Sequence, residues 1–309
     1  MIIQKLEECP VKNGSLRKVS EMGNVVEIQY MSHRNSKQTV QMLQGMKEYI
    51  HLSTGEIKNV TKHLTRYTLK KNLQRTFNTL RGIINTNITD VEKVRWITLT
   101  YKENMTDTVQ LYKDFEKFNK RFQYFCNKRN YGKAEYIVIM EPQSRGAWHC
   151  HLLYIFNHLS KAPYISNKEL SDLWFHGFVK ITKLDNIDNV GAYLTAYLGD
   201  MDMKECSHDE ILGNELKEIK TDNNGVKQSK YYVKGARLKY YPAKFNIFRC
   251  SRGIKMPLVS YMSEDKALKK VNNSLLTYEK TIKLSDSENN FESIINTRYY
   301  NSVRKNRKS

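Results

Sequence analysis

The sequence predicts an α+β fold in which a central five-stranded, mainly antiparallel sheet is flanked by helices. Three observations predict it. Segments with strand and helix patterns follow one another in the order β, α, β, β, α, β, α. Two of the strands are separated only by the turn-forming residues 142–146, as in a hairpin. Hydrophobic residues make up 40% of the 309 residues, which is sufficient for a buried core.

Residue spacing and turn chemistry justify each element. Strands are expected where β-branched and aromatic residues alternate with others, and helices where apolar residues recur every three or four positions. The stripe of phenylalanines in 111–125 is interpreted as core packing, and Asp188 or Asn189 is a suitable N-cap for the last helix. The expected strands are 95–101, 135–140, 148–156 and 178–184, and the expected helices are 111–125, 167–175 and 188–198.

Composition divides the chain into four regions. Residues 1–90 form an N-terminal region that contains a basic amphipathic helix, and residues 91–203 hold the sheet and its helices. Residues 204–265 are interpreted as an exposed, mobile insertion followed by a basic, aromatic C-terminal region, because 204–230 is charged and polar. Residues 266–309 are expected to be a basic tail.

The charge of the chain indicates a polyanionic partner. Lys and Arg number 51 against 32 Asp and Glu, a formal net charge of +19, and nucleic acid is the first candidate. No apolar run is long enough to span a membrane and no basic-then-apolar signal opens the chain, so we expect a cytoplasmic protein without a membrane partner. The five cysteines contain no C-x-x-C pair, which argues against a disulfide framework or a zinc ribbon.

The basic helix is expected over 58–81, where seven Lys and Arg residues occur without an acidic residue. Leu73, Phe77 and Leu80 recur at helical spacing, so one face should pack on a core while the cations line the rest. A helix that grips phosphates and a solvated helix that is merely basic are equally good interpretations of this pattern.

The sharpest local pattern is Trp148-His149-Cys150-His151-Leu152 on the second strand of the hairpin. In a strand, His149 and His151 project from the same face and Cys150 from the other. Hairpin pairing would bring Glu141, at the end of the preceding strand, beside both imidazoles. The three side chains would offer two nitrogens and one oxygen to a divalent cation, with positions left for phosphate and water. Taken alone, the pattern is better explained by two ordinary sheet histidines.

Tyr193 and Tyr197 stand four residues apart in the expected helix 188–198 and so share one face. A tyrosine hydroxyl, with an ordinary pKa of about 10, becomes a useful nucleophile when a cation or base helps to remove its proton. Attack on a DNA phosphodiester would leave a 5′-phosphotyrosyl intermediate and a free 3′-hydroxyl. Taken alone, packing is the better explanation of the two residues, because the chain contains 20 tyrosines.

Together these residues resemble the three ordered motifs of the HUH endonucleases, and most closely the rolling-circle replication initiators of phages and bacterial plasmids. The motifs are Ile97-Thr98-Leu99-Thr100, Glu141 with His149-Cys150-His151, and Tyr193-Leu194-Thr195-Ala196-Tyr197. The resemblance covers about residues 61–257. It implies the HUH endonuclease fold, Mg²⁺ or Mn²⁺ held by Glu141, His149 and His151, and Tyr193 and Tyr197 as the nucleophiles of the two-tyrosine branch. One departure is the lysine that the family often has three residues after a catalytic tyrosine: Ala196 and Asp200 stand there, and Lys204 follows one turn later.

For function, the resemblance implies an enzyme of a bacterial host cell that nicks single-stranded origin DNA by metal-dependent transesterification, with 91–203 as the nuclease core and a host helicase and replication machinery as partners. Two alternatives remain open. A tyrosine transposase or relaxase of the same superfamily would share the chemistry, whereas a non-catalytic single-stranded DNA-binding protein would not need the three metal-ligand candidates to converge. The residues expected to contact the DNA backbone are Lys62, Arg66, Lys70, Lys71, Arg75, Lys234, Arg237, Arg249 and Arg252.

Overall fold

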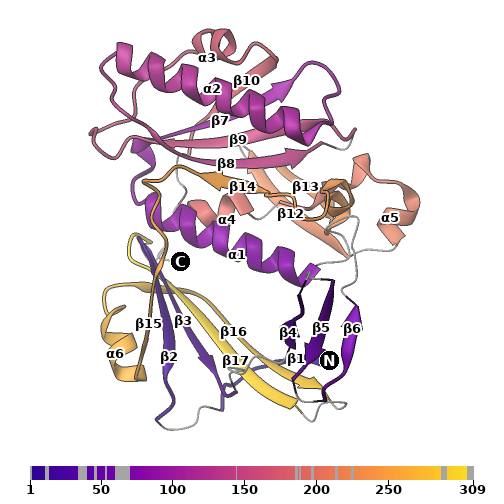
Figure 1. Ribbon diagram of the computed structural model, residues 1–309. Helices are drawn as coiled ribbons and strands as arrows, with labels where there is room; N and C mark the ends of the chain where they lie inside the picture. Colours follow the sequence, from indigo (N-terminus) through magenta and orange to yellow (C-terminus); the bar gives the residue numbers. More distant parts are fainter. Residues whose placement is uncertain are drawn as a thin grey trace. The chain divides into compact units, whose positions relative to one another are not determined.

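A computed structural model gives the structure of the chain (Figure 1). It describes residues 2–10, 14–33, 40–44, 47–52, 54–59, 70–143, 145–184, 187, 189–195, 198–212, 215–223, 226–286 and 291–304. The chain splits into two compact units. The first is formed by residues 1–21, 25–64 and 258–309, and the second by residues 22–24 and 65–257.

The second unit is built on a five-stranded sheet whose strands are all antiparallel to their neighbours, in the order β10-β7-β9-β8-β14. This confirms the expected α+β class and the expected succession of elements. The last of the five strands is only three residues long and was not foreseen. The strands are β7 (Val94–Tyr101), β8 (Glu135–Pro142), β9 (Trp148–Ile155), β10 (Gly177–Thr182) and β14 (Phe248–Cys250).

One face of this sheet is covered by α2 (Thr108–Lys128) and α3 (Asn167–Trp174) (Figure 1). Helix α2 begins where the Asp107 carboxylate accepts hydrogen bonds from the backbone N–H groups of Val109 and Gln110. Its phenylalanine stripe is buried as expected, and the Phe122 ring stacks on Tyr154 of β9 with ring centroids 3.9 Å apart. The aromatic residues of α2 are therefore core residues, which leaves the opposite face of the sheet for polar groups.

Helices α1 (Lys70–Asn87) and α4 (Val190–Thr195) lie on that opposite face (Figure 1). Asn85 of α1 holds the start of α4, because its amide donates to Asn189 Oδ1 over 3.0 Å and its Oδ1 accepts from the Gly191 N–H over 2.8 Å. The Asn189 side chain in turn accepts from the N–H of Ala192, so Asn189 acts as the expected cap. The position of α4 is therefore set by α1.

The expected basic helix differs from the structure. The helix begins at Lys70 and runs to Asn87, while Lys58 lies in β6 (Ile57–Asn59). Residues 60–69 lie outside the described residues. The alternation of Lys and Arg at helical spacing therefore overstated the N-terminal extent of the helix, because charge spacing alone does not distinguish a strand of three residues from a helical turn.

The rest of the second unit includes a hairpin where an exposed insertion was expected. Strands β12 (Leu216–Asn223) and β13 (Val226–Val233) pair antiparallel, and β13 also pairs with β11 (Met201–Asp202). The polar composition was misleading because a two-sided polar hairpin lacks the apolar alternation of a half-buried strand. Short helical elements complete the unit, namely η2 (Val91–Lys93), η3 (Met203–Glu205), α5 (His208–Leu212) and η4 (Ala236–Tyr240).

The first unit contains a six-stranded sheet in the order β1-β16-β17-β3-β2-β15, together with a three-stranded sheet. Residues 266–309, expected to be a tail, instead supply most of α6 and two long strands of this sheet. The larger sheet is made of β1 (Ile2–Leu6), β2 (Arg17–Met22), β3 (Val25–Met31), β15 (Leu258–Met262), β16 (Leu275–Asp286) and β17 (Phe291–Asn301), with α6 (Glu264–Lys269) packed on it. The smaller sheet contains β4 (Val40–Met42), β5 (Glu48–His51) and β6.

Candidate metal centre and nucleophile

The register of the hairpin brings three metal-ligand candidates to one face of the sheet. Glu141 of β8 lies directly opposite His149 of β9, and Ile139 lies opposite His151. Because residues opposite each other in an antiparallel pair project from the same face, the side chains of Glu141, His149 and His151 share that face. Cys150 points the other way and is fully buried. The strand parity expected from the sequence is confirmed.

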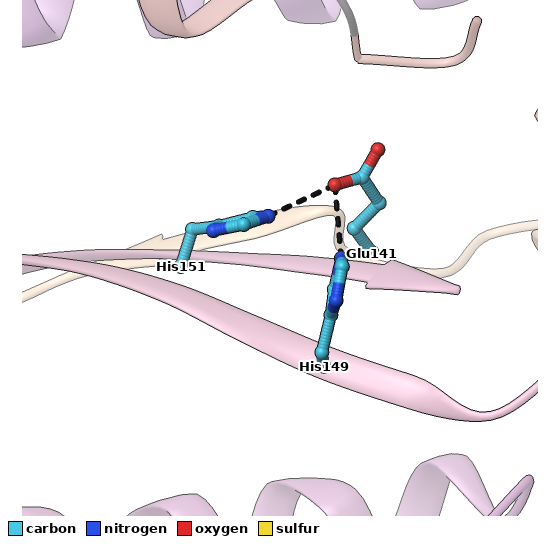
Figure 2. Close-up of side chains that lie close together, drawn as sticks. All are labelled: Glu141, His149 and His151. Atoms are coloured by element: carbon cyan, nitrogen blue, oxygen red, sulfur yellow. Dashed lines mark hydrogen bonds and ion pairs between the residues drawn. The ribbon is translucent and has the colours of Figure 1, made fainter. Parts of the chain in front are cut away.

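The three side chains converge on a single carboxylate oxygen (Figure 2). The Nε2 atoms of His149 and His151 each lie 3.0 Å from Oε2 of Glu141. One ligand atom from each residue lies within 4.8 Å of the others, so the three residues form a possible metal site. Two imidazole nitrogens and one carboxylate oxygen are a donor set that suits divalent transition metals and also accommodates harder cations.

Further contacts fix the orientation of these ligands. Thr98 Oγ1 on β7 lies 3.2 Å from Nδ1 of His151, which leaves Nε2 of that ring directed at Glu141. The guanidinium of Arg237, on η4, forms an ion pair with the other oxygen of Glu141, Oε1. Glu141 is only 6% exposed, so its two oxygens are held by neighbours rather than by bulk solvent.

Burial and contacts shift the pKa values of the site. Burial alone would raise the pKa of Glu141, but the bonds from His149 and His151 and the charge of Arg237 outweigh it and hold that pKa well below its usual range. Burial lowers the pKa of His149 further than its bond to Glu141 raises it. The carboxylate is therefore ionised and the His149 imidazole neutral at pH 7, which are the forms that bind metal ions.

Tyr193 reaches the same site from helix α4. It lines a pocket of about 180 Å³ together with Glu141, His151, Trp96 and Leu194, among others. Its ring packs edge-on against Trp96, with centroids 6.0 Å apart, and the residue remains 44% exposed. The structure therefore brings Tyr193 to the metal-ligand candidates, whereas Tyr197 lies outside the described residues.

A second, polar pocket of about 310 Å³ borders the other histidine. It is lined by Gln143, Arg145, His149, Glu205 and Arg237. Arg237 was expected only as one of several residues that contact the DNA backbone. Its pairing with Glu141 was missed, because no local spacing connects η4 with the end of β8.

The remaining basic candidates are scattered over the second unit. Arg75 is exposed on α1, Arg252 is exposed in the turn after β14, and Lys234 pairs with Glu215 over 2.9 Å. Arg249 stacks on the Tyr112 ring of α2, so it lies on the face of the sheet opposite to His149 and His151. Lys62 and Arg66 lie outside the described residues, as do the side chains of Lys70 and Lys71.

None of the helices that the structure describes is both long enough and apolar enough to cross a membrane.

Comparison with known families bears on the same stretch of chain. Residues 94–202 match the model of a family of replication-associated proteins of the ORF2 type. No curated protein matches the chain. The matched segment is about a third of the chain. It holds Glu141, His149, His151 and Tyr193 but ends before Arg237, so the metal-ligand candidates and the tyrosine lie in the part of the chain that is similar to replication-associated proteins.

Proposed function

We propose that this chain is a rolling-circle replication initiator of the HUH endonuclease type, which nicks single-stranded origin DNA and retains the cut 5′ end on a tyrosine. The observation that supports this most directly is the pocket that Tyr193 shares with Glu141 and His151. A protein that only bound single-stranded DNA would not need a nucleophile beside a metal-ligand set. The family match of residues 94–202 points to the same class of protein.

The residues fit a bound divalent cation. Their ligand atoms are close enough to share one ion, Glu141 is ionised, and Thr98 orients the His151 ring. Mg²⁺ or Mn²⁺ is proposed, since imidazole ligands favour Mn²⁺ and cellular abundance favours Mg²⁺. When bound, the cation supplies a Lewis acid that stabilises negative charge on a phosphate oxygen.

The chain's own residues carry out the covalent step. The hydroxyl oxygen of Tyr193 or Tyr197 attacks phosphorus, and a tyrosine–phosphate bond forms as the bond from phosphorus to the 3′ oxygen breaks. The hydroxyl proton is lost to water, and the departing 3′ oxygen takes up a proton. The products are a 5′-phosphotyrosyl adduct and a free 3′-hydroxyl. Because the number of phosphodiester-type bonds is unchanged, a 3′-hydroxyl can later attack the adduct and rejoin the strand.

The test is to incubate the purified protein with Mn²⁺ and a pool of labelled single-stranded DNA, and to look for a covalent adduct on a denaturing gel. We expect an adduct that EDTA abolishes and that peptide mass spectrometry maps to Tyr193 or Tyr197. Tyr193→Phe and Tyr197→Phe, separately and together, identify the nucleophile. Tyr124→Phe, at a 70% exposed position on α2, is the matched control and should form the adduct normally. Full activity of the double variant would exclude the covalent mechanism.

A further inference from the structure

We propose that Arg237 binds the phosphodiester that is cut, in the polar pocket it shares with Arg145 and His149. This inference rests on the proposed function and adds a substrate-binding residue from outside the segment that matches the family model. The pocket and its contacts lie entirely within the second unit.

The backbone around Arg237 is fixed to the turn that follows the tyrosine-bearing segment. The N–H of Arg237 donates to the carbonyl oxygen of Gly199 over 3.0 Å. The N–H of Gly235, two residues earlier, donates to Oδ1 of Asp200, also over 3.0 Å. Asp200 is 8% exposed, so this anchor is shielded from solvent. Arg237 is thus held in register with the chain that follows Tyr193, and a change in one position would be transmitted to the other.

The guanidinium of Arg237 is only partly used by the protein. One terminal nitrogen pairs with Oε1 of Glu141, while both histidines address Oε2, so Arg237 does not compete for the oxygen on which the imidazoles converge. The side chain is 14% exposed, and its buried Nε has no hydrogen-bond partner in the described part of the chain. A guanidinium has five N–H donors, and a buried donor without a partner is a place where a ligand atom is expected.

The pocket around these free donors has the chemistry of a phosphate site. Two guanidinium groups, Arg145 and Arg237, line it together with the amide of Gln143 and the imidazole of His149, and one carboxylate, that of exposed Glu205, lies at the same pocket. Planar guanidinium groups bind phosphate oxygens in a bidentate manner, and they remain charged when buried. A phosphodiester is therefore the ligand class that this lining fits.

The two pockets place the pieces of the reaction on either histidine. The pocket of Tyr193 includes His151 and Glu141, and the pocket of Arg237 includes His149. The strand geometry places His149 and His151 next to each other, with ring centroids 4.5 Å apart. A phosphate near both rings would be within reach of the tyrosine from one pocket and of Arg237 from the other.

The experiment compares Arg237→Gln and Arg237→Lys with Arg129→Gln. Arg129 is a matched control because it is 52% exposed and pairs with Glu169 at the far end of α2. In EDTA, the affinity for short fluorescent oligo(dT) and for the DNA recovered from the adduct assay is measured by anisotropy over a range of NaCl. Loss of one phosphate contact should lower the slope of log affinity against log salt by about 0.7 in Arg237→Gln. The slope should not change in Arg129→Gln.

A kinetic measurement then examines the reaction itself. Adduct formation is followed in a single turnover at saturating DNA and at Mn²⁺ concentrations shown by EPR to saturate each variant. Loss of a charge-stabilising donor predicts a rate about 100- to 1,000-fold lower in Arg237→Gln, with partial recovery in Arg237→Lys. Saturating Mn²⁺ separates this role from any effect that Arg237 exerts through Glu141.

The outcomes are distinct. An unchanged salt slope in a folded Arg237→Gln variant overturns the proposal, whatever happens to the rate, because an effect through Glu141 alone would not change that slope in EDTA. If this variant does not fold, Arg145→Gln decides, since Arg145 is exposed and lines the same pocket. If the wild-type chain forms no adduct but the slope still falls in Arg237→Gln, the phosphate contact stands and the endonuclease proposal fails.

Discussion

The two oxygens of the Glu141 carboxylate have separate tasks. Oε2 faces both imidazoles, and Oε1 faces Arg237. The carboxylate is buried, so each oxygen depends on these neighbours to offset its desolvation. A cation that replaced the imidazole contacts at Oε2 would leave the Arg237 contact intact. The residue therefore joins the metal-ligand candidates to the polar pocket.

Removing the charge of Glu141 should destabilise the metal-free protein. In Glu141→Gln, Arg237 becomes a largely buried cation without its carboxylate, and breaking a buried ion pair from one side costs about 3–5 kcal/mol. We expect urea unfolding in EDTA to show a loss of this size in the free energy of unfolding. The double variant Glu141→Gln/Arg237→Gln should lose less than the sum of the two single variants, because the pair is coupled. Additive losses would show that the two side chains do not interact.

Asp200 should make stability depend on pH in a defined direction. Burial raises its pKa from the ordinary value, against the opposing effects of the Gly235 N–H and the charges of Lys217, Lys234 and Arg237. A raised pKa in the folded state contributes stability below the unfolded pKa, and this contribution is lost as pH rises through the folded pKa. Asp200→Asn keeps the acceptor for Gly235 but cannot ionise. Relative to wild type, its melting temperature should therefore rise between pH 4 and pH 7, and the opposite trend would contradict the pKa direction.

The candidate site was predictable where it depends on strand parity and not where it depends on distant chain segments. His149 and His151 share a face because they are two residues apart, and Glu141 joins them through a short hairpin. Tyr193 required the further assumption that its helix packs on that face, which the resemblance supplied. The contact of Arg237 with Glu141 depends on how η4 folds back, and no spacing in the sequence encodes that.

At the scale of elements, helix α4 carries the nucleophile but is too short to define its own position. It has six residues, and isolated helices of that length are not stable in water. Its place is fixed by α1: Asn85 binds Asn189 and Gly191, and Arg81 Nε donates to Thr195 Oγ1 over 3.2 Å. A Cβ atom on Gly191 would collide with the backbone carbonyl oxygen of Arg81. The close approach of the two helices therefore requires glycine.

Gly191→Ala should displace Tyr193. The methyl group would meet backbone rather than a flexible side chain, so α4 has to move away from α1, at a cost of about 1–3 kcal/mol. We expect a matching loss in the free energy of unfolding and a large loss of adduct formation, with Mn²⁺ binding retained because none of the three metal-ligand candidates lies on α4. Thr79→Ala, at an exposed position on α1, is the control and should leave adduct formation unchanged. Normal activity of Gly191→Ala would show that the position of α4 is not critical.

Elements with apolar periodicity were predictable, and those without it were not. Strand β7 and helix α2 bury one face each and show the alternation or stripe that this requires. Strand β14 has three residues, too few for any period to be visible. Strands β12 and β13 are rich in charged and polar residues, so their sequence is typical of an exposed insertion. Polar strands are held by backbone pairing, which leaves little trace in the sequence.

At the scale of the whole molecule, the first unit joins the two ends of the chain in one sheet. Strand β16 pairs with β1, and β17 pairs with β3. The core beneath them is small and combines Val19 and Ile28 with Ala267, Val271 and Tyr300. Neither end shows a complete apolar face by itself, which is why the N-terminal region looked weakly periodic and the C-terminal region looked like a tail. Pairings over such a separation cannot be inferred from local patterns.

A chain that ends at Pro257 tests this division. It would lack β15, β16 and β17, so β1 would lose its partner, and β2 and β3 would be left as an isolated hairpin, which is marginally stable at best. The buried side chain of Arg17 would also lose its ion pair with Glu264. Hydrogen exchange should therefore show fast exchange in residues 2–6 and 25–31 of the shortened chain, in contrast to the full chain.

The second unit should behave differently in the same experiment. Strands β7, β8 and β9 and the residues that converge on Glu141 all lie within 65–257, so their amide protection and the affinity for Mn²⁺ should match those of the full chain. Protection lost in β7–β9 would mean that the nuclease-like unit needs the terminal sheet to fold. Protection retained in β3 would mean that the N-terminal strands are stable without β17. The predicted combination, with one unit unfolded and the other intact, is the only result that agrees with two separately folded units.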